Sequence, residues 1–142
     1  MHNSTLIRGL LLLLLALGLQ IGQAQVIFSE DFGDQATSEA NWINGGTNAG
    51  TQDWMWTNDP TTGPFNGAAF GAPTADNGFF SFDSDANGEN PHDVTLTSPS
   101  FDATASSNTQ VTFWSRYAYY TADALAELRV STDGGSTWTA HV

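Results

Sequence analysis

The sequence predicts an all-β domain, an antiparallel β-sandwich of the jelly-roll type, preceded by a helical signal peptide. Short segments of alternating apolar and polar residues recur along the second half of the chain, and Gly, Asn and Pro turn signals separate them. No helical 3.6-residue period is found beyond the signal peptide. The chain has 142 residues, 40% of them hydrophobic and 12% aromatic. This is enough apolar surface for the core of one domain.

Residues 1–24 have the features of a secretory signal peptide. Arg8 supplies the positive end, residues 10–19 form the apolar block, and Gly22-Gln23-Ala24 precedes the cleavage point. The block is shorter than the roughly 18–20 residues that span a bilayer, although a retained anchor is the alternative. We therefore expect a secreted or cell-surface module over residues 25–142, with no stable membrane span after cleavage.

Five segments are predicted strands, at residues 26–30, 78–82, 93–97, 109–120 and 126–131. In the strongest, 109–120, alternate residues from Val111 to Tyr119 share one face. Residues 31–77 are predicted loop, with turns at 44–46 and 58–60 and scattered Trp and Phe anchors. The Asp133-Gly134-Gly135 turn predicts a hairpin leading into residues 137–139.

The sequence stops at Val142, just after this hairpin opens. A sandwich needs further strands to pair its last edge. We therefore expect an incomplete module of a larger multidomain chain, with a small complete sandwich as the alternative.

Charge and cysteine content exclude several functions. The chain carries 3 Lys+Arg against 15 Asp+Glu, a net charge of −12, and it has no Cys. Nucleic acids and anionic lipids are excluded as partners because both require clustered basic residues. Disulfides, thiolate zinc sites and a Cys nucleophile are excluded as well. Abundant carboxylates favour a hard cation such as calcium.

Residues 83–88 read Asp-Ser-Asp-Ala-Asn-Gly and predict a calcium loop. Oxygen ligands at alternate positions converge when such a loop curls. The predicted ligands are Asp83, Asp85 and Asn87, with Asp93 or Glu89 closing the shell and Glu30 or Asp31 reaching in from the first strand. An EF-hand is excluded, because its twelfth position falls on Val94. The alternative is a solvated acidic turn.

Residues 131–138 match the Asp-box pattern S-x-D-x-G-x-T-W. Asp133 is predicted to accept hydrogen bonds from turn amides, Gly135 to take a positive φ, and Trp138 to pack over the turn. The role of these residues is structural. A sialidase propeller is excluded, because it needs several blades and clustered arginines.

Aromatic residues supply candidate ligand contacts. They are Trp54, Trp56, Tyr119 and Tyr120, together with Arg116. Flat rings with polar neighbours suit sugar stacking or a protein interface. The alternative for most of them is core packing.

No catalytic motif is present. His92 and His141 lie outside any G-x-S-x-G, H-E-x-x-H or P-loop pattern. The acidic residues offer many carboxylate pairs for glycoside hydrolysis, but no spacing singles one out. We therefore expect a non-enzymatic chain.

Four stretches together resemble one family. They are SEDF at 29–32, NGFFSFDSDANG at 77–88, DVTLTSP at 93–99 and LRVSTDGGSTW at 128–138. They are similar to the MAM-like jelly-roll modules of secreted bacterial proteins, of the choice-of-anchor and cleaved-adhesin type. The resemblance implies a calcium-stabilised sandwich for adhesion or ligand binding, with metal at Glu30, Asp83, Asp85 and Asp93. It also implies further strands after the hairpin.

The sequence leaves three functions open. The first is a secreted, non-catalytic binding or adhesion module for a glycan or protein ligand. The second is an accessory domain of a secreted peptidase or glycosidase whose catalytic part lies downstream. A purely structural surface-layer module is the third reading.

Overall fold

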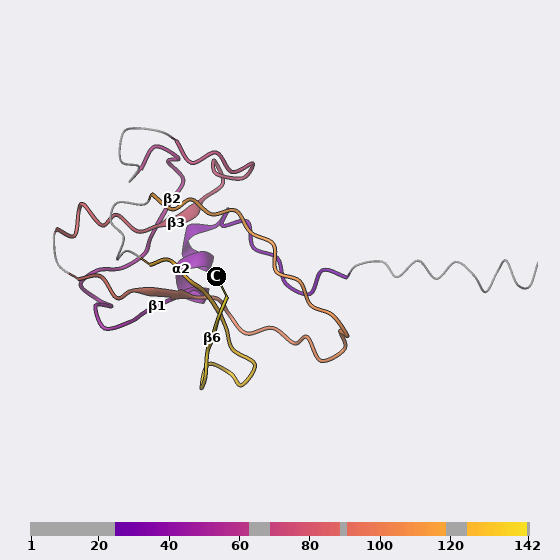
Figure 1. The fold of residues 1–142 in the computed structure, drawn as a ribbon. Coiled ribbons are helices and arrows are strands. Elements are labelled where there is room, and N and C mark those ends of the chain that lie inside the picture. The colour runs from indigo at the N-terminus through magenta and orange to yellow at the C-terminus, as the bar shows by residue number, and fades with distance from the viewer. Residues whose placement is uncertain (1–24, 63–68, 89–90, 119–124, 142) are drawn as a thin grey trace, which may run out of the picture.

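The computed structural model describes residues 25–62, 69–88, 91–118 and 125–141 (Figure 1). The predicted signal peptide, Glu89, Tyr119 and Tyr120 lie outside these ranges. The described part holds one helix, α2 (Gln35–Asn41), and six short strands. The strands are β1 (Ile43–Gly45), β2 (Met55–Thr57), β3 (Phe79–Ser81), β4 (Thr95–Thr97), β5 (Leu128–Val130) and β6 (Thr139–His141).

The strands form three antiparallel pairs: β1 with β4, β2 with β3, and β5 with β6. In the first pair Asn44 lies opposite Leu96, and in the second Trp56 lies opposite Phe80. The third pair is the predicted hairpin, with Arg129 opposite Ala140. The described chain is therefore β-rich with little helix, as the sequence predicts.

Three of the predicted strand regions contain an observed strand, namely β3, β4 and β5. The prediction is wrong at 26–30 and 109–118, where the described backbone is extended but assigned to no strand. The loop prediction for 31–77 is also wrong in part, because this region holds β1 and β2. Residues 44 and 45, predicted as a turn, lie in β1, and the chain turns only at Gly46.

Helix α2 corrects the expectation that no helix follows the signal peptide. Its N-cap is Asp34, whose carboxylate accepts a hydrogen bond from the Thr37 backbone N–H at 2.7 Å. Such a cap satisfies one of the open amides of a helix N-terminus. The helix packs against β2. Its seven residues are too few to show a helical period in the sequence, so Asp34 was the only local signal.

An aromatic cluster holds these elements together, formed by Phe28, Phe32, Trp42, Phe80 and Phe101. The Phe32 ring lies 5.2 Å from that of Trp42 and 5.6 Å from that of Phe80, and Phe28 stacks on Phe101 at 5.6 Å. Phe32 adopts a positive φ of 58°. Its N–H donates to Glu30 Oε1, and its carbonyl accepts from Trp56 Nε1 at 2.9 Å. Both backbone groups of this unusual turn are thus satisfied.

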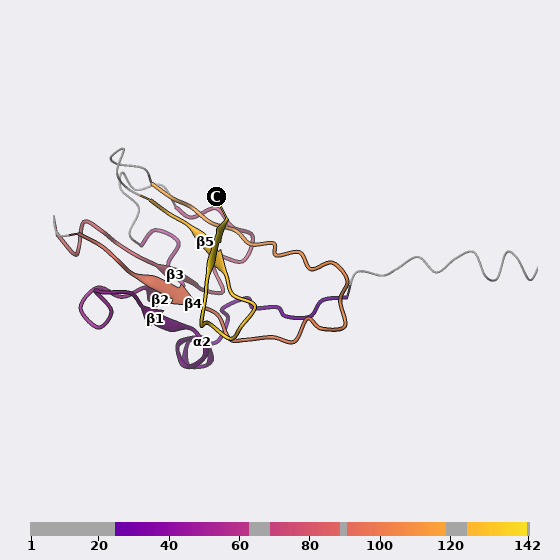
Figure 2. The same cartoon turned by 60° about the horizontal axis from the view of Figure 1, so that its bottom comes forward.

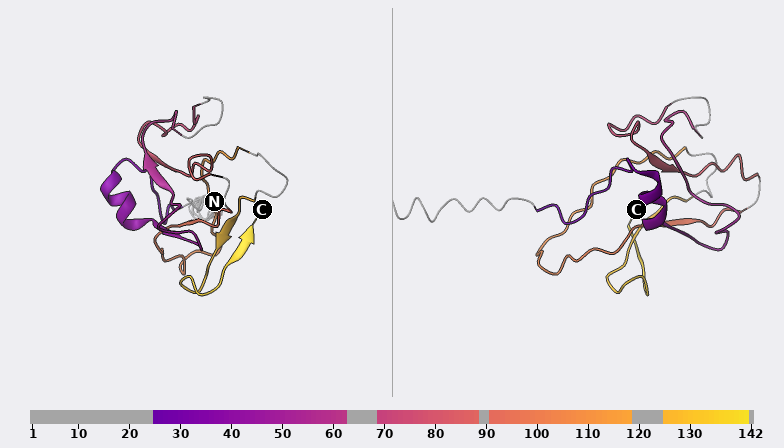
Figure 3. Two further views of the ribbon diagram at one scale, coloured as in Figure 1. Left: turned by 90° about the vertical axis from the view of Figure 1, so that its left-hand side faces the viewer. Right: turned by 180° about the vertical axis from the view of Figure 1, so that it is seen from behind.

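The C-terminal part packs little against the rest. Every described residue from 107 to 118 is exposed, and so are all residues of β5 and β6. In the left-hand view of Figure 3, the β5–β6 hairpin lies on the opposite side of the molecule from α2. In the described ranges, no helix has the length and apolar character needed to cross a membrane.

Candidate functional site

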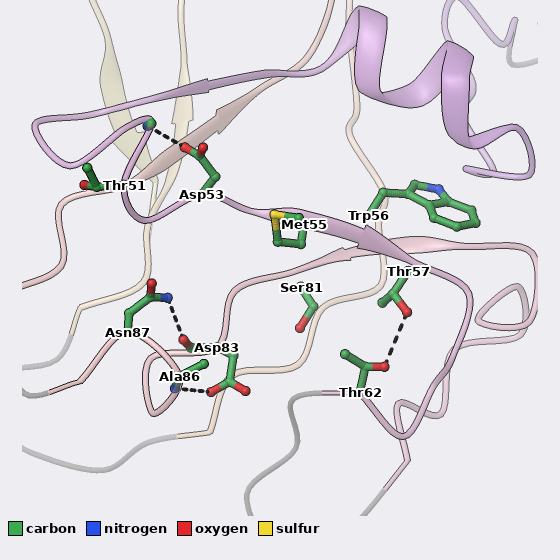
Figure 4. A pocket seen from close by; sticks show the side chains of 11 residues that line it. Thr51, Asp53, Met55, Trp56, Thr57, Thr62, Ser81, Asp83, Ala86 and Asn87 are labelled. Atoms are coloured by element: carbon green, nitrogen blue, oxygen red, sulfur yellow. Dashed lines mark hydrogen bonds between the residues drawn. The ribbon is translucent and has the colours of Figure 1, made fainter.

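A cavity of about 460 Å³ lies beside the β2–β3 pair (Figure 4). One wall comes from the turn that precedes β2, and the other from the acidic turn that follows β3. Its lining carries two carboxylates, one amide and four side-chain hydroxyls, together with the apolar surface of Met55, Trp56 and Ala86. The polar side chains are Asp53, Asp83, Asn87, Thr51, Thr57, Thr62 and Ser81.

The first wall is organised by Asn48 and Asp53. The N–H groups of Thr51 and Gln52 donate to the Asn48 carbonyl, and Asp53 Oδ1 accepts from the Gly50 N–H at 2.9 Å. Asn48 also exchanges hydrogen bonds with Asp93: its Oδ1 accepts from the Asp93 N–H, and its own N–H donates to the Asp93 carbonyl. The turn is therefore fastened to the chain just before β4.

The second wall is the predicted calcium loop. Asp83 Oδ1 accepts from the N–H groups of Asp85 and Ala86 at 3.0 and 3.1 Å. Asn87 Nδ2 donates to the Asp83 carbonyl at 2.7 Å. Asp83 and Asn87 are half-buried, whereas Asp85 is exposed. The loop is thus a hydrogen-bonded turn that presents Asp83 and Asn87 to the cavity.

The remaining predicted metal ligands have their own partners elsewhere. Glu30 Oε1 accepts from the Phe32 N–H at 2.8 Å. Asp93 Oδ2 accepts from both the N–H and the hydroxyl of Thr47. These two bonds hold the pKa of Asp93 below its ordinary value, and the charge of Arg129 adds to the effect. Within the described ranges, no three His, Asp or Glu residues lie together as a metal site requires.

The predicted ligand-binding aromatics are divided between the cavity and the interior. Trp56 lines the cavity, but its indole N–H is bonded to Phe32, and the ring points away from Met55 and Ser81 (Figure 4). Trp54 does not line the cavity, and its ring lies 5.9 Å from that of Phe82. Arg116 lies on the exposed stretch 107–118 and does not line the cavity.

Asn44, which the sequence predicts in a turn, has a structural role in the contact between β1 and the start of β2. Its Oδ1 accepts from the Trp54 N–H at 2.8 Å, and its Nδ2 donates to the Trp54 carbonyl at 3.0 Å. The side-chain amide thus imitates a strand partner and fixes the start of β2 beside β1. Gln52 and His92 make a similar link, with Oε1 and Nδ1 at 2.8 Å.

The Asp-box residues close the β5–β6 hairpin. Asp133 accepts from the Thr137 N–H at 2.8 Å, the Thr137 hydroxyl at 2.6 Å and the Ser131 hydroxyl at 2.8 Å. These bonds lower the pKa of Asp133 to about 2. Gly135 has a φ of 89°, and Trp138 Nε1 donates to its carbonyl at 3.0 Å. All these contacts lie within the hairpin and form no part of the cavity.

Comparison with known proteins gives no independent assignment. No family model, curated protein or solved structure matches the chain. The cavity and the chemistry of its lining are therefore the features that indicate function.

Proposed function

We propose that the chain is a secreted, non-catalytic binding module that recognises a neutral carbohydrate in the cavity between the 48–53 turn and the 83–88 turn. The observation that carries this proposal is the mixed lining of the cavity. Carboxylates, an amide and hydroxyls surround the apolar side chain of Met55. Sugar rings present hydroxyl groups and apolar C–H faces together, so both kinds of surface find a counterpart.

The charge of the site sets the class of sugar. Asp53 and Asp83 place two carboxylates on the lining, in a chain of net charge −12. Like charges repel, so sialylated, uronic and sulfated sugars are disfavoured. Carboxylates are acceptors only, and they suit neighbouring sugar hydroxyls as donors.

The proposal also covers the overall fold to which the three strand pairs belong. The three strand pairs are proposed to belong to a MAM-like sandwich, as the sequence resemblance implies. Calcium is part of what that resemblance implies, but Glu30 and Asp93 bond to Phe32 and Thr47 away from the cavity, so the proposed sugar contacts do not involve a metal.

The test is a glycan array that carries neutral and acidic oligosaccharides, followed by calorimetric titration of the best-binding glycan. We expect binding to neutral glycans only. The variants Asp53→Asn and Asp83→Asn keep an acceptor for the turn amides but lose the charge. Each is expected to weaken binding about tenfold, the value of one charge-assisted hydrogen bond.

The matched control is Asp76→Asn, which removes the same charge from an exposed carboxylate outside the cavity. It is expected to leave the affinity unchanged. The absence of any glycan ligand, or an equal loss in the control, would contradict the proposal.

A further inference from the structure

Residues 110–118, named here the acid-free strand, form a long extended stretch with both faces exposed (orange in Figure 2). The large apolar side chains of this strand are exposed to solvent. Val111 is 53% exposed, Phe113 56%, Trp114 67% and Tyr117 49%. Contiguous exposed apolar surface of this kind marks an interaction site in soluble proteins.

The backbone of the central residues, 111–115, is equally open. In the described part of the chain, residues 111–115 make no backbone hydrogen bond. An extended backbone with open N–H and C=O groups and alternating apolar side chains is the template for β-strand addition. The occupant that satisfies both features is another extended polypeptide strand.

Charge narrows the choice of occupant. The chain has 15 Asp and Glu residues, yet residues 103–122 contain none, and Arg116 lies within this run. Two copies of a protein with net charge −12 repel each other over most of their surfaces. Two copies that pair along this strand place no carboxylate of the strand opposite another one.

The sequence of the strand is partly self-complementary. In an antiparallel pair of two copies centred on Trp114, Val111 lies opposite Tyr117, Thr112 opposite Arg116, and Trp114 opposite its own copy. These three pairs match in polarity, whereas Phe113 opposite Ser115 and Gln110 opposite Ala118 do not. The two copies are then related by a twofold axis, the usual symmetry of a homodimer.

We propose that the acid-free strand pairs with the same strand of a second copy, antiparallel and in register about Trp114, and that the protein is a homodimer through this edge. The strand is short compared with standard interfaces, so the expected dissociation constant is in the micromolar range. The proposal is independent of sugar binding in the cavity.

The first test is sedimentation equilibrium of the purified protein over a range of concentrations that brackets this constant. Trp114→Glu places two like charges face to face at the twofold axis, and we expect it to weaken association at least tenfold. The matched control is Leu125→Glu, which adds the same charge at an apolar side chain that is 69% exposed but outside the strand. It should not change the association.

The register is tested by cross-linking, because the chain has no cysteine of its own. Under mild oxidation, Trp114→Cys is expected to form a covalent dimer, since opposed Cα atoms lie about 4.5–5.5 Å apart, within disulfide range. Gln110→Cys and Ala118→Cys alone place their thiols about 26 Å apart, at eight positions. Each alone should fail, whereas a mixture of the two should cross-link.

A monomer at every concentration would overturn the proposal, and so would equal cross-linking by all three single variants. Self-association that Leu125→Glu weakens as much as Trp114→Glu would assign the interface to another surface and would also overturn it.

Discussion

At the residue scale, Asp133 shows how a fully exposed carboxylate acquires a strongly shifted pKa. Hydrogen bonds from Thr137 and Ser131 favour the charged form and hold its pKa at about 2. The unfolded value is near 3.9. Because the folded pKa is the lower one, the stabilising contribution is complete above about pH 4 and is lost as the pH falls from there through 2.

We therefore expect the Thr137 amide resonance to titrate with a midpoint near pH 2, because this N–H donates to Asp133. NMR of the protein between about pH 1.5 and 6 measures it. In the control variant Asp133→Asn, the titration in this window should disappear. A midpoint of 4 or above in the unmodified protein would mean that the hydrogen bonds of the turn do not persist in solution.

Gly78 is a buried position that has no room for an added methyl group. It is buried, and an added Cβ would lie 2.4 Å from the Phe32 carbonyl oxygen and 2.6 Å from the Trp56 ring. Gly78→Ala is therefore expected to reduce the free energy of unfolding by about 2–4 kcal/mol. Gly71→Ala is the control, because nothing lies within 4 Å of its added Cβ. Chemical denaturation of both variants should show a change below about 0.5 kcal/mol for the control.

At the element scale, the start of β2 depends on the side chain of Asn44. Asn44→Ala removes both hydrogen bonds to the Trp54 backbone and leaves half-buried groups without these partners. We expect a loss of about 1–3 kcal/mol in unfolding free energy. Asn77→Ala, at an exposed side chain in a turn, should change it by less than about 0.5 kcal/mol. Equal effects of the two variants would show that the Asn44 amide does not anchor β2.

Elements with a local signal were the ones that the sequence predicted. Period-2 alternation located β4 and β5, a short Phe-rich run located β3, and the Asp-Gly-Gly turn located the hairpin. Strands β1 and β2 were missed because they lie in the Gly-, Asn- and Thr-rich region predicted as loop and owe their position to Asn44, a contact ten residues away in sequence. At 109–118 the alternation predicted a strand, but the described part of this segment belongs to none of the three strand pairs. An alternating side-chain pattern predicts an extended backbone, but it does not predict which segment pairs with it.

The candidate site was predicted only in part for the same reason. Asp83 and Asn87 were singled out from their local spacing, and both line the cavity. Asp53, Thr62 and Ser81 carry no local motif, and only the pairing of β2 with β3 brings their segments together. Ligand spacing also suggested that Asp83 and Asp93 share one metal shell. Asp93 instead bonds to the loop at Thr47 and Asn48.

At the scale of the whole molecule, the apolar surface is unevenly distributed. The aromatic cluster packs together the part of the chain that carries the cavity. In contrast, the apolar side chains of Leu128, Val130 and Trp138 are exposed, like those of the acid-free strand. A core limited to one part of the chain makes that part the more stable one. Amide hydrogen exchange is therefore expected to be slowest in β2 and β3 and fastest in residues 110–118 of the monomer. Protection of 110–118 that increases with protein concentration would connect this prediction to the proposed dimer.

Calcium is tested on the whole molecule by thermal unfolding in millimolar calcium and in chelator. A metal bound only by the folded state at a hundredfold excess over its dissociation constant adds about 2.7 kcal/mol. In a domain of about 100 residues this raises the midpoint by ten degrees or more.

The separate hydrogen-bond partners of Asp83 and Asp93 lead us to expect that calcium raises the unfolding midpoint by less than about two degrees. Both samples need the same ionic strength, because any salt screens repulsion in a chain of net charge −12. A calcium-dependent rise of ten degrees in the unfolding midpoint that Asp83→Ala abolishes would contradict this expectation. It would support the predicted calcium loop and would mean that calcium binding rearranges the 83–88 turn.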